Sequence, residues 1–183
     1  MPIAIVLLAF TTGCADHILA AHNQAPANER PREANSAPSP DTSKWQVYRN
    51  EKYGFQLKCP NSWGVHSSTG NPADIIYFSG PFRGSVRPQL DLAIQPNMNP
   101  HKLSVEEWLE DQLRATGLKL ETTGRFTIGS QPAVFMEKTT RSGRVRVTFL
   151  LLHQTDVLAF SYELGSDDNP TYVAIINSFR VLK

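Results

Sequence analysis

The sequence predicts an α+β domain in which helices lie on an antiparallel sheet. Several stretches alternate apolar and polar residues with a period of two, as half-buried strands do. Only two stretches, beginning near 104 and 169, repeat apolar residues with helical spacing. Strands do not alternate with helices, so a parallel nucleotide-binding sheet is not expected, and no segment repeats, which excludes a solenoid.

The overall composition is that of an ordinary globular protein. The chain has 183 residues, enough for one domain with tails. Its 18 Lys plus Arg nearly balance its 17 Asp plus Glu, which gives a formal charge of +1. So small a charge gives no reason to expect a nucleic acid partner.

The first fourteen residues predict export. Residues 3–10 (IAIVLLAF) form an apolar run that is too short to span a bilayer but suits a signal peptide. Residues 11–14 (TTGC) resemble a bacterial lipobox, whose cysteine is acylated and becomes the new N-terminus. We therefore interpret 1–14 as a lipoprotein-type signal peptide. Lipidation at Cys14 would anchor the chain to a bacterial membrane, on its periplasmic, lumenal or outer-surface side.

Two features depart from that pattern. Thr11 stands where a lipobox usually has Leu, so an ordinary secretory signal cleaved near Cys14 is the alternative. No Lys or Arg precedes the apolar run, and we therefore expect the true start upstream of Met1, which N-terminal mapping of the precursor tests.

Residues 15–43 predict a disordered tether. They contain four prolines, seven alanines and no aromatic residue, so they cannot bury enough apolar surface to offset chain entropy. A flexible coil of this length spans on the order of 30 Å, enough to hold a domain clear of lipid headgroups. His17 and His22 lie here, but two histidines without carboxylate or thiol partners rarely bind a metal.

The folded domain is expected over 44–183. A short strand around 45–47 precedes the first clear strand, 55–59, on which Cys59 lies on the apolar face as a small core residue. A disulfide between Cys59 and Cys14 would require a Cys14 that is not acylated. The turn 60–62 then leads to Trp63, which predicts a hairpin corner capped by an aromatic ring.

The central part predicts two more strands and a helix. Strands are expected at 74–79 and 89–95, after the loops 67–73 and 81–88. Ser104 and Glu107 form the pattern of a capping box. An apolar stripe of four residues follows, and Gly117 is the expected stop. The stripe consists of Val105, Trp108, Leu109 and Leu113.

The last third predicts four strands and a second helix. The expected strands are 119–128, 132–139, 144–151 and 158–162, and the last two form an antiparallel hairpin. Asn169 is the expected cap of the helix, with Pro170 at its first position. Four apolar residues at helical spacing would lie on the sheet. They are Tyr172, Ile175, Ile176 and Phe179.

Several of these stretches resemble the PsbP-like family. The opening Tyr53-Gly54-Phe55, the alternation to Pro60 and the following Asn61-Ser62-Trp63 are similar to its opening motif, although Cys59 stands where an aromatic or aliphatic residue is commoner. The resemblance extends over 44–183 and implies a PsbP/Mog1-like α/β/α sandwich around an antiparallel sheet. It also implies a non-enzymatic role, because family members include the extrinsic subunit of the oxygen-evolving photosystem and cyanobacterial lipoprotein relatives.

Catalytic signals are weak. The sequence contains no nucleophile elbow, zinc-protease helix, phosphate loop or dinucleotide fingerprint. His66 precedes Ser67, but adjacent residues of an extended chain point to opposite faces. His101 and His153 are interpreted as surface polar residues. A divalent cation held by His153, Asp156 or the pair Asp167-Asp168 is a further hypothesis. Turn formation and the electrostatics of a helix start are the preferred explanation of these residues.

One cluster of basic residues stands out against the nearly neutral charge of the chain. It comprises Lys138, Arg141, Arg144 and Arg146 around one hairpin, with Arg83 and Arg87 on another loop. The plain interpretation is a solvated strand surface that resists aggregation. The functional interpretation is a docking patch for acidic protein surfaces or anionic headgroups, which arginine forks suit.

Three hypotheses remain. The first is a membrane-tethered, non-enzymatic binding or assembly accessory of a membrane or envelope complex, associated with photosystem II only if the source is an oxygenic phototroph. The second is a protein that binds a small ligand or divalent metal in the cleft between helix and sheet. The third is a hydrolase with a site that the sequence does not reveal.

Overall fold

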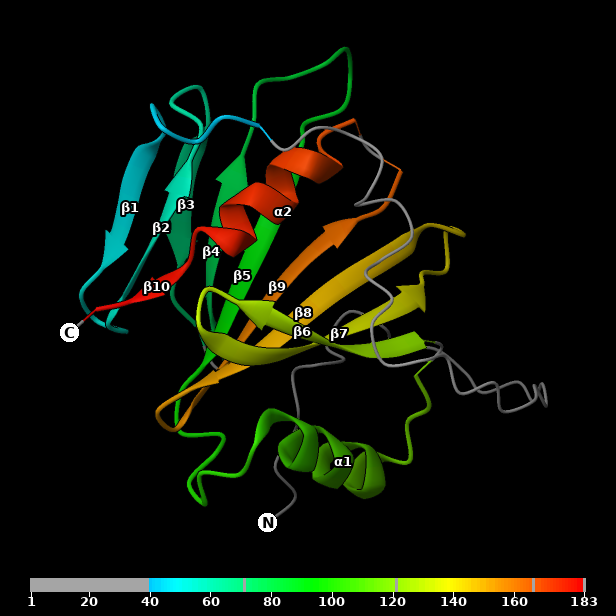
Figure 1. The fold of residues 1–183 in the computed structure, drawn as a ribbon. Coiled ribbons are helices and arrows are strands. Elements are labelled where there is room, and N and C mark those ends of the chain that lie inside the picture. The colour runs from blue at the N-terminus through cyan, green and yellow to red at the C-terminus, as the bar shows by residue number, and fades with distance from the viewer. Residues whose placement is uncertain (1–39, 71, 121, 166, 183) are drawn as a thin grey trace.

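The computed structural model describes residues 40–70, 72–120, 122–165 and 167–182. The predicted signal peptide 1–14, with Cys14, and most of the predicted tether lie outside these ranges. The described residues form two antiparallel sheets and two helices (Figure 1). The elements are β1 (Gln46–Asn50), β2 (Phe55–Cys59), β3 (Gly64–Ser68), β4 (Asp74–Ser79), β5 (Gln89–Gln95), α1 (Val105–Thr116), β6 (Thr122–Ile128), β7 (Gln131–Thr139), β8 (Val145–His153), β9 (Asp156–Glu163), α2 (Asn169–Asn177) and β10 (Arg180–Val181).

The larger sheet has seven strands in the order β3-β4-β5-β9-β8-β7-β6, all antiparallel to their neighbours. Its hairpins join consecutive strands, and the β5–β9 pair, with Leu92 opposite Phe160, joins the two halves. This confirms the predicted antiparallel α+β class. β3 extends to Ser68, into the predicted loop 67–73, because this residue pairs with Ile75 of β4.

The smaller sheet corrects one prediction. Its order is β1-β2-β10, so the predicted hairpin corner between β2 and the strand after Trp63 does not form. Both edges of β2 are occupied, by β1 and by β10, and β3 pairs with β4 in the other sheet instead. The turn at Pro60 therefore passes the chain from one sheet to the other. The side-chain amide of Gln46 holds this crossing through the carbonyls of Pro60 and Trp63, at 3.1 and 2.9 Å.

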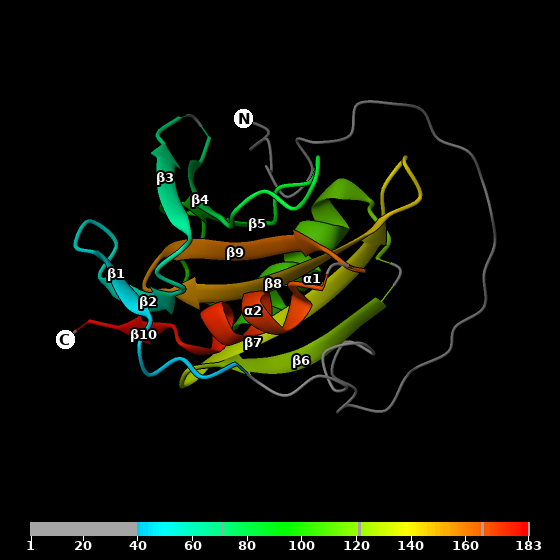
Figure 2. The ribbon, with the colours of Figure 1, turned by 90° about the horizontal axis from the view of Figure 1, so that it is seen from above.

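Alternate residues of the larger sheet point to two faces, which we name after the helices that cover them. On the α2 face, Phe149 and Phe160 are buried in one cluster with residues of α2 and of the smaller sheet. On the α1 face, Leu150 and Val157 are buried against Trp108 of α1. In Figure 2, α2 lies in front of the strands and α1 behind them.

The first helix forms as predicted. Glu107 N–H donates to the Ser104 hydroxyl, and the Glu107 carboxylate accepts from Ser104 N–H at 2.9 Å, so both halves of the capping box are present. Gly117 ends the helix in the left-handed conformation, at φ 68°. The Trp108 indole donates to the Met98 carbonyl at 2.9 Å, which fixes α1 to the loop before it.

The second helix begins one residue earlier than predicted. Asn169 is its first residue and not its cap, and Asp168 occupies the cap position without a capping hydrogen bond from its side chain. The Asp168 carboxylate instead accepts from Arg83 at 2.9 Å. The helix ends at Asn177, so Phe179 follows it in the link to β10, where its ring is fully buried against Phe55.

The predicted α/β/α sandwich holds only in its coarser form. The described part of the chain is mostly sheet, with one helix on each face. α1 contacts β7 and β8, whereas α2 contacts β2 and β6. Each helix therefore covers part of a face, and the smaller sheet completes the cover on the α2 face.

Candidate docking surface

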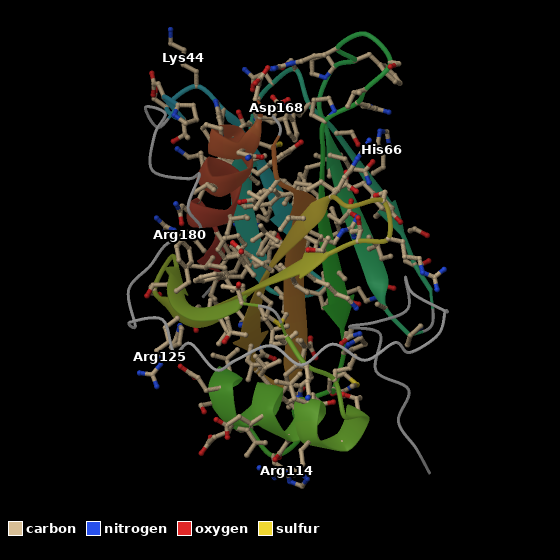
Figure 3. All side chains as sticks on the ribbon, turned by 90° about the vertical axis from the view of Figure 1, so that its right-hand side faces the viewer. Lys44, His66, Arg114, Arg125, Asp168 and Arg180 are labelled. Carbon is tan, nitrogen blue, oxygen red and sulfur yellow. The ribbon has the colours of Figure 1, made fainter. Side chains whose placement is uncertain are left out.

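Loops from four parts of the chain meet at one end of the larger sheet, which we call the docking end. The segments are 40–44, 81–88, 140–144 and the described residues of 164–168. The strand register places 81–88, 140–144 and 164–168 there, because Ser79 pairs with Gln89 and Glu163 pairs with Arg146 where these strands leave the sheet. Segment 40–44 joins them because the Asn61 amide, in the turn that leads to β3, donates to the Lys44 carbonyl at 3.0 Å. Figure 3 shows Lys44 and Asp168 at this end and Arg114, on α1, at the other.

The six predicted patch residues gather at this end in two groups. Arg83 and Arg87 lie on the β4–β5 loop, whereas Lys138, Arg141, Arg144 and Arg146 surround the β7–β8 turn. Lys138 is directly opposite Arg146. The two hairpins are separated by three strand spacings, about 14 Å along the sheet. The patch is therefore two basic groups that one extended partner surface could contact.

Acidic side chains neutralise part of this charge. Arg83 binds Asp168, whose side chain is only 6% exposed, at 2.9 Å. Arg144 binds Glu163 at 2.7 Å, and this contact raises the pKa of the Arg144 guanidinium. The paired arginines are held in defined positions with more than half of each side chain exposed. They can therefore accept a further oxygen ligand without being reordered.

A polar area of the α1 face lies between α1 and the docking end. The side-chain amide of Gln89 donates to Asp91 at 2.7 Å, and the hydroxyls of Thr148 and Ser161 are 2.9 Å apart. Burial raises the pKa of the Asp91 carboxyl, although the Gln89 hydrogen bond and the charge of Arg146 oppose that rise. This area was not predicted from the sequence because its members come from three strands, β5, β8 and β9.

A groove of 530 Å³ runs between α2 and the smaller sheet. The Ser178 hydroxyl accepts from Lys58 N–H at 2.7 Å on its wall, and Pro40, where the described chain begins, lines its rim. Its other lining residues are Thr42, Val47, Gln56, Leu57, Pro170, Val173, Ala174, Asn177 and Arg180. The groove is a concave site between helix and sheet, the place that the small-ligand hypothesis requires.

The β4–β5 loop carries apolar residues that sequence analysis did not single out. Phe82 is 68% exposed and Val86 is 64% exposed. The signal in the sequence is two large apolar residues inside a loop of Pro, Gly and Arg (PFRGSVRP), but a sequence does not show whether such residues fold inward.

Three individual predictions can be compared with the structure. Cys59 is fully buried, which confirms the predicted core residue, and this burial raises the pKa of its thiol. His66 is exposed on β3 opposite Tyr77. The prediction for His153 was wrong: the residue is only 8% exposed, and its Nε2 is 3.5 Å from the place of a Cβ on Gly54, in the turn between β1 and β2.

The proposed cation ligands do not come together. His153 faces Asp156 across the β8–β9 hairpin, whereas Asp168 follows the far end of β9 and binds Arg83. Among the described residues, no three His, Cys, Asp or Glu side chains are grouped as metal ligands. The same residues include no helix long and apolar enough to cross a membrane.

Comparison with solved structures identifies the fold. The chain is similar to the solution structure of cyanobacterial PsbP (CyanoP) from Synechocystis sp. PCC 6803, with a TM-score of 0.51 and 15% sequence identity. The match covers 80% of this chain and 97% of that chain. The domain therefore has a PsbP-like fold, as the resemblance in the sequence implied. No family model and no curated protein matches the sequence.

Proposed function

We propose that this protein is a membrane-tethered, non-enzymatic accessory that binds a membrane or envelope protein complex through its docking end. The observation that supports this most directly is the position of the basic groups. Pro40, where the described chain begins, lines a groove with Pro170, close to the Arg83–Asp168 pair, so the expected tether would join the domain near one of the basic groups. The PsbP-like fold supports an accessory role. Association with photosystem II is proposed only for an oxygenic phototroph.

Charge reversal tests the docking surface. In the lipidated full-length chain, Arg141, Arg144 and Arg146 are changed to Glu, and partners are identified by affinity purification from membranes. We expect loss of the partner that the unaltered chain retains. Arg114→Glu is the matched control, because Arg114 is exposed at the opposite end of the domain. Retention of every partner by the triple variant would refute the docking role.

Acylation is tested separately. Metabolic labelling with a radioactive fatty acid should modify the unaltered chain and leave a Cys14→Ser chain unlabelled. If both chains lack label, the signal is an ordinary secretory one, and the tether proposal fails.

The groove favours a second candidate function, binding of a small ligand. A pocket of 530 Å³ is within the size range of small-molecule sites, and it offers polar groups from Gln56, Lys58 and Asn177 beside apolar ones. A thermal-shift screen with divalent cations and small metabolites should then find a stabilising compound. Its effect should disappear in Ala174→Phe, which fills the groove. A compound that stabilises both chains equally would not bind there.

A further inference from the structure

We propose that the tip of the β4–β5 loop, residues 82–87, inserts into the headgroup region of an anionic lipid bilayer. Phe82 and Val86 would enter the interface between water and lipid, and Arg87 would bind lipid phosphates. This inference deepens the proposed function, because it assumes that the docking end faces a membrane.

Exposure of apolar side chains is the first argument. Among the described residues, three large apolar side chains are exposed, and two of them, Phe82 and Val86, lie on this tip. The third, Val47, is 56% exposed on the smaller sheet. The tip thus concentrates apolar surface that the fold itself does not bury.

The tip is held in shape by hydrogen bonds, so the exposure is built into the fold. Gly80 N–H donates to the Pro88 carbonyl at 2.9 Å, and the backbones of Arg83 and Val86 exchange bonds of 2.8 and 3.2 Å. The Arg83–Asp168 contact ties the tip to the start of α2. Because the tip is ordered before binding, insertion would cost little conformational entropy.

The chemistry of the tip suits a lipid surface. The Arg87 guanidinium carbon lies 5.5 Å from the centre of the Phe82 ring, and Arg87 Nε donates to the Gly80 carbonyl at 3.2 Å, so a cation is held beside an exposed aromatic ring. Aromatic and basic side chains together favour the interface of anionic membranes. Two apolar residues are far too few for a stable protein interface, which takes about 800 Å² from each partner, but they suffice to supplement a lipid anchor.

The position of the tip agrees with a lipid anchor. Pro40 and Pro170 line the same groove, and Asp168, beside Pro170, binds Arg83 of the tip. The start of the described chain, the start of α2 and the tip therefore lie together at one end (Figure 1). The expected tether would therefore join the domain at the end that carries the tip, and its flexibility would let the tip reach the bilayer.

Fluorescence quenching by lipid tests this inference on the full chain carrying Cys14→Ser, which removes the acyl group. A tryptophan is introduced as Phe82→Trp or, as the matched control, Val47→Trp. Vesicles contain phosphatidylcholine and phosphatidylglycerol, with a brominated lipid as quencher. We expect quenching beyond the background of the native tryptophans at position 82 and not at position 47. Equal quenching at the two positions, including none at either, would overturn the proposal.

Partitioning gives a second measurement. In the same Cys14→Ser chain, Phe82→Ser with Val86→Ser should lower binding to the anionic vesicles about tenfold, whereas Val47→Ser should leave it unchanged. Arg87→Gln should weaken binding to anionic vesicles more than to phosphatidylcholine alone. If the tip variant instead loses a protein partner and binds vesicles normally, the tip contacts protein and the lipid proposal is wrong. Because Cys14 is absent from these chains, the result does not depend on acylation.

Discussion

The two faces of the larger sheet use alternate residues of the same strands and have opposite characters. On the α2 face, Phe149, Phe160 and Tyr162 are buried under α2 and the smaller sheet, and their rings contact one another or Phe179. On the α1 face, the helix covers only the part around Leu150, and polar side chains such as Asp91 occupy the rest. The burial of aromatic side chains on the α2 face therefore provides most of the stability, whereas the α1 face can carry polar side chains.

The largest difference in the free energy of unfolding is expected between variants at two neighbouring residues of β9. Phe160→Ala should lower the free energy of unfolding by about 3–5 kcal/mol, because it leaves a cavity beside Phe179, whose ring centre is 6.0 Å away. Ser161→Ala removes only the hydrogen bond to Thr148 and should cost at most about 1 kcal/mol. Denaturant unfolding measures both. Similar losses would show that the two faces contribute equally.

A smaller loss of unfolding free energy is expected from a substitution in the β6–β7 turn, which contacts the link between α2 and β10. Gly129 has φ +61°, and a Cβ there would lie 2.5 Å from the Phe179 carbonyl oxygen. Gly129→Ala should therefore cost about 2–3 kcal/mol, from the left-handed backbone and the displaced link to β10. Gly143→Ala is the control, because Gly143 has φ +78° but open space around it, and it should cost about 1 kcal/mol. Thermal unfolding compares the two variants, and equal shifts would show that the contact with Phe179 is unimportant.

The sequence predicts the elements whose signals are local and misses the contacts between distant segments. Strands such as β5 and β8, and the capped helix α1, are encoded by local alternation and by local capping residues, and the structure confirms them. The division into two sheets depends on Arg180 pairing with Gln56 across most of the domain, and no local pattern encodes that contact. For the same reason the burial of His153 beneath Gly54 was not predictable.

The candidate surface was predictable only in part. The basic residues were visible as a cluster, because four of them surround one turn. That Arg83 joins them follows from strand order, which the sequence does not state. Exposure of Phe82 depends on the Arg83–Val86 bridge and on the Asp168 contact, so only the folded loop reveals it.

Asp74, on the α2 face, has a carboxylate that two side chains hydrogen-bond, and its contribution to stability is expected to depend on pH. Asp74 accepts from Lys52 and from the Tyr53 hydroxyl, each at 2.6 Å, and these bonds lower the pKa of its carboxyl. A lowered pKa stabilises the fold above the ordinary aspartate pKa, and this contribution is lost as the pH falls through the lowered value. Asp74→Asn should cost about 1 kcal/mol at neutral pH and progressively less in acid. A loss that does not change with pH would rule out this charge effect, and unfolding curves across the acid range measure it.

Asp91, on the open α1 face, should give the smallest effect and the opposite sign. Burial raises the pKa of its carboxyl, so the folded state disfavours the charged form. The cost is present above the raised pKa and disappears as the pH falls below the ordinary aspartate value. Asp91→Asn, which keeps a hydrogen-bond acceptor for Gln89, should therefore stabilise the protein at neutral pH by less than about 1 kcal/mol and change nothing in strong acid. Destabilisation at neutral pH would mean that the attraction of Arg146 outweighs desolvation. Ion pairs would then hold the polar side chains of the α1 face, as they do at the docking end. The two faces would differ in their ion pairs as well as in the elements that cover them.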